Sequence, residues 1–165
     1  MKKSNYLIFV LLLGLPLLGL NENTDGGEVE WKEFNRGIEI AKKEKKYVII
    51  DFYTDWCGWC KKMDNLTYSD REVQRLLSSH FVSIKINAED ELHSLVYENK
   101  TYTYAEFTQY LGINGFPTTV FLDPDGKAIT KVPGFIQKEK MAKILNYFSS
   151  ESYKKQTFDE FIVRN

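Results

Sequence analysis

The feature that most constrains this chain is a cysteine pair, Cys57 and Cys60, placed directly after the short apolar segment 47–53. This segment is rich in β-branched and aromatic side chains, and it is apolar enough to be a central strand rather than an edge strand. A strand followed by C-x-x-C at the start of a helix makes one thiol a nucleophile and holds a second thiol within its reach. The chain has no other cysteine, so the pair is either a redox couple or half of a metal site.

A metal site is the less favoured interpretation of the cysteines. Structural zinc and iron–sulfur sites use about four protein ligands. Apart from the cysteines, the remaining candidate ligands are His80 and His93, and neither has the spacing of such a site. We therefore predict no metal, and no cofactor other than the redox-active pair itself.

Size and charge restrict the function further. The chain has 165 residues, enough for one domain with a substantial core. Its 22 basic and 23 acidic side chains give a formal net charge of -1. Nucleic-acid-binding domains carry a clear basic excess, so we predict no nucleic-acid partner.

The first twenty residues differ from the rest of the chain. Lys2 and Lys3 precede a nearly uninterrupted apolar run, residues 6–20. The run has the length of a signal-peptide core and is short for a membrane-spanning helix. We therefore predict that residues 1–20 are a signal peptide or an N-terminal anchor in the inner membrane, and that the protein is exported to the periplasm. No A-x-A cleavage site precedes the polar linker predicted over residues 21–27, so removal and retention both stay open.

Hydrophobic periodicity predicts an alternation of helices and strands along the rest of the chain. The expected elements are a helix over 31–45, the strand 47–53, a helix from the cysteines that kinks near 65–68 and resumes at Asp70, a strand over 81–87, a helix over 104–111, strands over 118–122 and 127–132, and helices around 141–148 and 157–163. Residues 89–103 show no clear pattern. The order indicates an α/β class with a central mixed sheet of four to five strands flanked by helices. The predicted domain spans 28–150, with a C-terminal extension over 151–165.

Four local motifs resemble the thioredoxin superfamily. They are the stretch from Asp51 to Lys61 that contains both cysteines, then Lys85-Ile86-Asn87, then Gly115-Phe116-Pro117-Thr118, and then Gly134. The resemblance covers about residues 31–148 and implies a thioredoxin fold. Within the exported branch, the chain looks most like the thioredoxin-related proteins of periplasmic sulfur oxidation and reductant delivery.

The resemblance and the residues together suggest roles around the cysteines. Cys57 is expected at a helix N-terminus, where free N–H groups and the helix dipole favour a thiolate that attacks a partner's disulfide. Cys60 would then resolve the mixed disulfide. Asp51 lies mid-strand among apolar residues that should raise its pKa. Its alignment with the family's buried acid implies a proton acceptor for Cys60, with Lys85 as its charge partner; a partly solvated carboxylate at a strand end is the alternative.

A second set of residues is implied to bind the substrate. The family places a cis proline beside its disulfide, which leaves backbone groups free to pair with an extended substrate, so we predict a cis Pro117. Trp56 and Trp59 should form an apolar platform around Cys57, although partial core packing of Trp56 is an alternative. Phe116 replaces the smaller aliphatic residue that is commoner in the family, which leaves substrate preference open. The predicted substrate-binding residues are Trp56, Gly58, Trp59, Phe116, Pro117, Thr118 and Gly134.

The resemblance implies an exported thiol–disulfide oxidoreductase that exchanges its dithiol with disulfides of partner proteins. The Gly58-Trp59 spacer carries no charge or histidine that would stabilise the thiolate further, which favours a reductase. With no flavin or nicotinamide motif in the sequence, a membrane thiol–disulfide donor would have to supply electrons. We expect a monomer. Two alternatives remain open: a disulfide oxidase or isomerase, and a redox-inert binding module with a thioredoxin fold.

Overall fold

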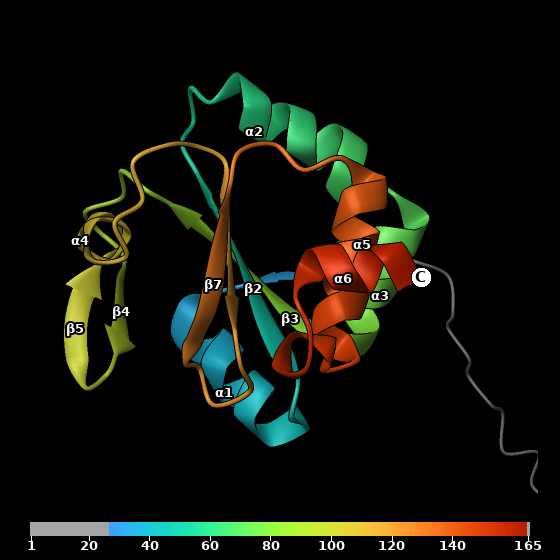
Figure 1. Cartoon of the computed structure of the whole chain (residues 1–165). Helices are drawn as coiled ribbons and strands as arrows, with labels where there is room; N and C mark the ends of the chain where they lie inside the picture. The colour runs from blue at the N-terminus through green and yellow to red at the C-terminus, as the bar shows by residue number, and fades with distance from the viewer. Residues whose placement is uncertain (1–26, 165) are drawn as a thin grey trace, which may run out of the picture.

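A five-stranded mixed sheet forms the centre of the computed structural model, which describes residues 27–164 (Figure 1). Three neighbouring strands are parallel, and the last two alternate in direction. In spatial order the strands are β1 (Trp31–Lys32), β3 (Phe81–Asn87), β2 (Tyr47–Tyr53), β6 (Thr118–Leu122) and β7 (Ala128–Pro133). The predicted α/β class, the central position of β2 and the mixed thioredoxin-like sheet are confirmed.

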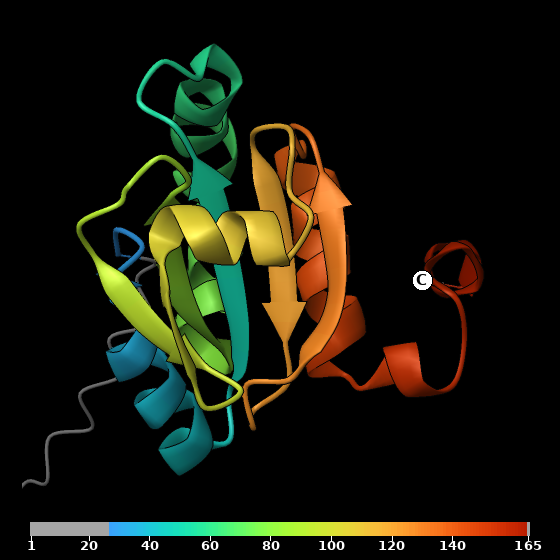
Figure 2. The same cartoon turned by 90° about the vertical axis from the view of Figure 1, so that its left-hand side faces the viewer.

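Helices cover both faces of this sheet (Figures 1 and 2). One face carries α1 (Phe34–Glu44) and α4 (Tyr104–Tyr110), and the other carries α3 (Arg71–His80) and α5 (Lys138–Ser149). The short helix α2 (Gly58–Met63) begins beyond the carboxyl end of β2. Alternate side chains of β2 therefore enter two separate cores, as expected for a strand buried on both faces.

The predicted kink after the cysteines is a π-helical segment, η1 (Asp64–Tyr68), which joins α2 to α3. A π-helical segment inserts an extra residue in a turn and so changes which side chains face inward. The Asp70 carboxylate then caps α3 by accepting hydrogen bonds from the backbone N–H groups of Glu72 and Val73. The predicted restart of the helix at Asp70 is confirmed.

The stretch with no clear sequence pattern contains a hairpin of β4 (Ser94–Tyr97) and β5 (Lys100–Thr103). It packs beside α4 through Leu95 and Tyr97, which are buried in the same core as α1. At its base, the Tyr104 N–H donates a hydrogen bond to the His93 carbonyl. The hairpin is therefore a side element of one core rather than a separate domain.

One predicted element begins in the wrong place. The helix expected over 31–45 starts only at Phe34, because Trp31 and Lys32 instead form β1 and pair with Ser83 and Ile84 of β3. Two residues of strand are too short to show a period, and the amphipathic pattern of the following helix masks them.

The C-terminal extension folds back onto the domain. It comprises the 3-10 turn η2 (Ser152–Lys154) and helix α6 (Phe158–Arg164). Phe158 and Phe161 contact the ring of Tyr147 on α5, at centroid distances of 5.4 and 5.3 Å. The helical turn predicted over 157–163 is confirmed.

The predicted signal peptide or anchor, residues 1–20, and nearly all of the predicted linker lie outside the described residues. Between residues 27 and 164, no helix is both long enough and apolar enough to cross a membrane.

Candidate active site

The two cysteines form a disulfide at the start of α2, with an S–S distance of 2.05 Å. Cys57 is the N-cap residue of the helix, and its Sγ accepts a hydrogen bond of 3.1 Å from the Cys60 N–H. The same N–H would face a Cys57 thiolate after reduction, and charged acceptors strengthen such hydrogen bonds. Both residues are buried, Cys57 with 4% and Cys60 with 2% of its surface exposed. The two cysteines therefore differ little in accessibility in the disulfide state.

Two exposed tryptophans flank the disulfide. Trp56 is 69% exposed and Trp59 is 57% exposed, so partial core packing of Trp56 was the wrong alternative. Trp56 meets Phe116 edge to face at 6.3 Å, and its Nε1–H donates a hydrogen bond of 2.9 Å to Glu89. The ring of Trp59, which lies between the two cysteines in the sequence, is 5.6 Å from that of Phe135. Each tryptophan is thus held by an aromatic neighbour and still presents a large apolar surface to solvent.

The Phe116–Pro117 peptide bond is cis, as predicted. Pro117 and Thr118 are buried, and the Thr118 hydroxyl donates a hydrogen bond of 2.7 Å to the Gly115 carbonyl. The Gly134 N–H donates a hydrogen bond of 2.8 Å to the Pro117 carbonyl, which joins the two loops. Within residues 27–164, the backbone N–H and C=O of Phe116 have no hydrogen-bond partner. Of the predicted substrate-binding residues, the structure leaves Trp56, Gly58 and Trp59 exposed, with Phe116 and Gly134 half-buried.

A buried carboxylate lies on β2, six residues before Cys57. Asp51 is fully buried, and its register neighbours are Lys85 on β3 and Thr119 on β6. The Lys85 ammonium lies 3.5 Å from Asp51 Oδ2, too far for a good hydrogen bond, and neither carboxylate oxygen has a hydrogen-bond partner among the described residues. Desolvation raises the pKa of Asp51 to about 7, although the charge of Lys85 opposes the rise. The expected burial and raised pKa are confirmed, and the solvated alternative was wrong.

The charge partner of Asp51 has a second carboxylate that the sequence reasoning missed. Lys85 also forms an ion pair with Asp64 of η1, whose side chain is 41% exposed. The rings of Trp31, Tyr53 and Tyr68 surround the ammonium, with centroids 5.0, 5.2 and 6.0 Å away. Lys85 therefore connects a buried acid to one that reaches solvent. The available signal was spacing, because Asp64 follows Cys60 by one helical turn.

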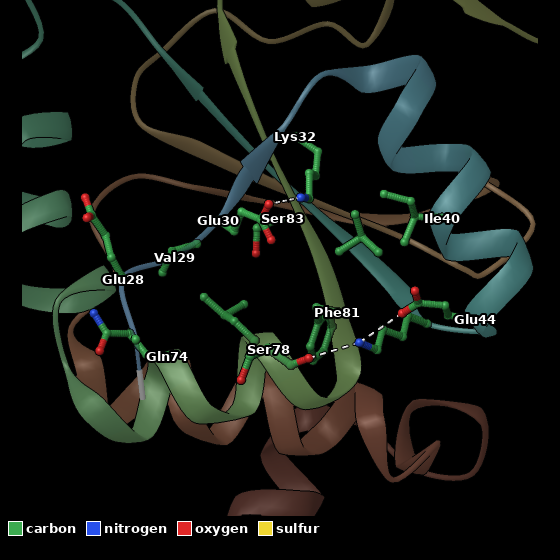
Figure 3. A pocket seen from close by; sticks show the side chains of 14 residues that line it. Glu28, Val29, Glu30, Lys32, Ile40, Glu44, Gln74, Ser78, Phe81 and Ser83 are labelled. Atoms are coloured by element: carbon green, nitrogen blue, oxygen red, sulfur yellow. Dashed lines mark hydrogen bonds and ion pairs between the residues drawn. The ribbon is translucent and has the colours of Figure 1, made fainter. Parts of the chain in front are cut away.

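A cavity of about 380 Å³ lies far from this site, between β1, α1, α3 and the start of β3 (Figure 3). Its charged lining is largely paired internally: Lys32 with Glu30, and Lys46 with Glu44 at 3.1 Å and with the Ser78 carbonyl at 3.0 Å. It borders the amino end of β3, whereas Cys57 follows the carboxyl end of the parallel strand β2. The cavity therefore takes no part in the disulfide site. Over residues 27–164, no group of three or more His, Cys, Asp or Glu side chains is arranged to hold a metal ion.

Two relatives and one solved structure relate the chain to known proteins. The thiol:disulfide interchange protein DsbD of Pseudoalteromonas atlantica is 32% identical over 112 residues, which cover 67% of this chain but only 17% of that protein. The disulfide bond reductase DsbH of Chlamydia pneumoniae is 24% identical over 134 residues, covering 74% of this chain and 80% of that one. The structure of a DsbH oxidoreductase matches with a TM-score of 0.61 at 19% identity, covering 84% of this chain and 94% of that one.

The match to the family is broader than any single motif. The thioredoxin-like domain model fits residues 34–149, from the start of α1 to the end of α5. That range contains the disulfide, the buried carboxylate, the cis proline and the joined loops. The chain therefore belongs to the thioredoxin-like domain family and is a thiol–disulfide protein of the thioredoxin superfamily.

Proposed function

We propose that this protein is an exported protein-disulfide oxidoreductase that works as a reductase through Cys57 and Cys60. The observation that carries the proposal is the position of the disulfide, at a helix start between exposed aromatic rings, in a protein with a buried Asp51 of raised pKa. The similarity to DsbH, a disulfide bond reductase, supports the proposed direction of electron transfer.

In the proposed reaction, the reduced protein starts with a Cys57 thiolate and a Cys60 thiol. Cys57 attacks one sulfur of a partner's disulfide, the second partner sulfur leaves as a thiolate, and a mixed disulfide forms. Asp51, in its ionised form, accepts the proton of Cys60. The Cys60 thiolate then attacks Cys57, forms the intramolecular disulfide and releases the first partner sulfur. Two electrons have moved to the partner, whose two thiolates take up protons.

Lys85 tunes this proton transfer in the proposed mechanism. Its positive charge lowers the pKa of Asp51, against the larger rise caused by burial, and so keeps the carboxylate able to change its charge near neutral pH. Asp64 shares the same ammonium and is partly exposed, which offers a route for charge compensation at the surface.

The substrate would bind across the residues that the sequence analysis assigned to substrate binding. Trp56, Gly58 and Trp59 present exposed surface next to Cys57, and the backbone groups of Phe116, which are unpaired among the described residues, are available to an extended chain. Buried Pro117 and Thr118 would shape this edge from beneath, with Gly134 fixed against it. Disulfide-containing proteins are the proposed partners, bound by a monomeric enzyme.

Export and the electron donor belong to the same proposal. Lys2, Lys3 and the apolar run 6–20 support export to the periplasm, with or without retention at the inner membrane. A reductase in an oxidising compartment needs a continuing source of electrons. A membrane protein that carries a reduced dithiol would supply them by reducing the Cys57–Cys60 disulfide.

Insulin reduction tests the central claim. With dithiothreitol as the electron source, the wild-type protein should speed the appearance of turbidity, and Cys57→Ser should not. A redox potential near the thioredoxin value of about -270 mV would support the reductase, whereas one near about -120 mV would support an oxidase and overturn the proposed direction. Equal turbidity with and without Cys57 would overturn the enzymatic proposal itself. Cell fractionation with an antibody against the full chain tests the compartment.

A further inference from the structure

A groove runs over η1, the start of α5 and α2, the helix that begins at the disulfide. It encloses about 800 Å³, and Lys62, Leu66 and Phe135 are among its lining residues. Phe135 connects the groove to the disulfide, because its ring lies against that of Trp59, which sits between the two cysteines. A polypeptide joined to Cys57 could therefore continue into the groove without leaving the surface.

The groove combines apolar surface with positive charge. Lys62 Nζ lies 4.6 Å from the ring centre of Trp59 and 5.5 Å from that of Phe135. Within residues 27–164, neither Lys62 nor Arg71, which lines the groove further along, forms an ion pair. The aromatic contacts hold the Lys62 ammonium close to the disulfide and leave its charge available.

Among the charged residues that line the groove, Lys62 lies against Trp59 of the C-x-x-C segment. Lys138 is already paired with Asp70 at 3.0 Å, and that pair lies at the α5 end of the groove. Glu139 adds one negative charge at the same end. Leu66 is 50% exposed and supplies apolar surface between the two ends.

We propose that this groove binds the partner polypeptide next to its reactive disulfide and selects a segment with an apolar and an acidic side chain close to the cysteine. The apolar side chain would pack on Phe135 and Leu66, and the carboxylate would pair with Lys62. This proposal rests on the proposed function, since it assigns a substrate preference to the Cys57 reaction. It makes Lys62 a specificity-determining residue rather than a catalytic one.

Peptides with an activated cysteine test the preference directly. In the full chain with Cys60→Ala, Cys57 attacks the peptide sulfur of a peptide–thiopyridyl disulfide and releases pyridine-2-thione, which is followed by absorbance. Three peptides are compared, identical except for Glu, Gln or Lys next to a leucine that follows the cysteine. Dithiodipyridine, which has no peptide, measures the reactivity of Cys57 itself.

Two charge reversals on the same helix distinguish a direct contact between Lys62 and the peptide from a long-range electrostatic effect. Lys62→Glu changes a residue that lines the groove, whereas Lys61→Glu makes the same charge change at an exposed neighbour that does not line it. The glutamate peptide should react about threefold to fivefold faster than the lysine peptide, the range of an exposed ion pair. Lys62→Glu should remove or reverse this ratio, and Lys61→Glu should preserve it.

The possible results are distinguishable. Equal rates for the three peptides, or equal loss of the ratio in both variants, would overturn the groove proposal while leaving the oxidoreductase intact. If Cys57 failed to react with dithiodipyridine, the proposed function itself would fail. Lys62→Gln, which removes the charge without reversing it, should give an intermediate ratio; an unchanged ratio in Lys62→Gln would also contradict the proposal.

Discussion

Replacing Asp51 with asparagine removes a charge that the interior of the sheet disfavours. The pKa of Asp51 rises from its ordinary 3.8 to about 7 in the folded protein, mainly because the side chain is fully buried. The folded protein thus holds this proton more tightly than the unfolded chain does. Below about pH 4 Asp51 is protonated in both states and does not reduce the free energy of unfolding. As the pH rises, ionisation of Asp51 lowers the free energy of unfolding, by about 4 kcal/mol at pH 7.

The asparagine variant should not show this loss. A buried amide without partners costs about 1–3 kcal/mol at every pH, so the absolute stability of the variant is less informative than its pH dependence. Relative to wild type, Asp51→Asn should gain about 4 kcal/mol between pH 4 and pH 8, at about 1.4 kcal/mol for each pH unit in the sensitive range. Urea unfolding of the oxidised proteins at pH 4, 5.5 and 8 measures this difference.

Asp64→Asn is the matched control, because Asp64 contacts the same lysine but is 41% exposed. Its stability relative to wild type should change by less than about 1 kcal/mol over the same pH range. A difference between Asp51→Asn and wild type that stayed constant from pH 4 to pH 8 would refute the reasoning. So would an equal pH dependence in the two variants.

Three further predictions concern stability. Reducing the Cys57–Cys60 disulfide, which closes a very short loop, should lower the free energy of unfolding by about 2 kcal/mol, measured by urea unfolding with and without reductant. Lys45, the C-cap of α1, has a φ of 55°, which glycine adopts more easily than lysine, so Lys45→Gly should stabilise the protein by about 1 kcal/mol. Lys43→Gly, inside the helix, should destabilise it by about 1 kcal/mol. Equal effects of the two substitutions in thermal melts would contradict this. Phe107→Ala should cost about 3–5 kcal/mol, because the ring is fully buried among other aromatic side chains, and a loss below about 1 kcal/mol would show that the core collapses around the gap.

The central part of the fold could be predicted from the sequence because the signals that define its elements are local. The apolar run of β2, the Asp70 cap and the glycine after α4 each act within a few residues of the element that they define. The hairpin over residues 94–103 gave no such signal, because its turn uses Glu98 and Asn99, both with positive φ, in place of glycine. Glutamate rarely takes this conformation, and the Glu98 carboxylate accepts a hydrogen bond of 3.1 Å from the Tyr110 hydroxyl of α4.

The site shows the same limit. The pairing of Asp51 with Lys85 was implied by the family resemblance, and the structure places the two residues at matching positions on adjacent strands. Asp64 and Phe135 were missed, because the first depends on the phase of a π-helical segment and the second on how a loop folds over α2. Sequence periods indicate which face of a strand a side chain occupies, whereas contacts made through irregular backbone depend on the whole fold.

The β4–β5 hairpin is a suitable site for an insertion, because a backbone hydrogen bond joins the two ends of the hairpin at its base. The backbone hydrogen bond between Tyr104 and His93 holds the two ends of the hairpin together independently of its tip. Glu98 and Asn99 at the tip are exposed, while Leu95 and Tyr97 anchor the hairpin below. A fluorophore or an affinity tag inserted between Glu98 and Asn99 would thus report on the protein while its redox centre kept its geometry.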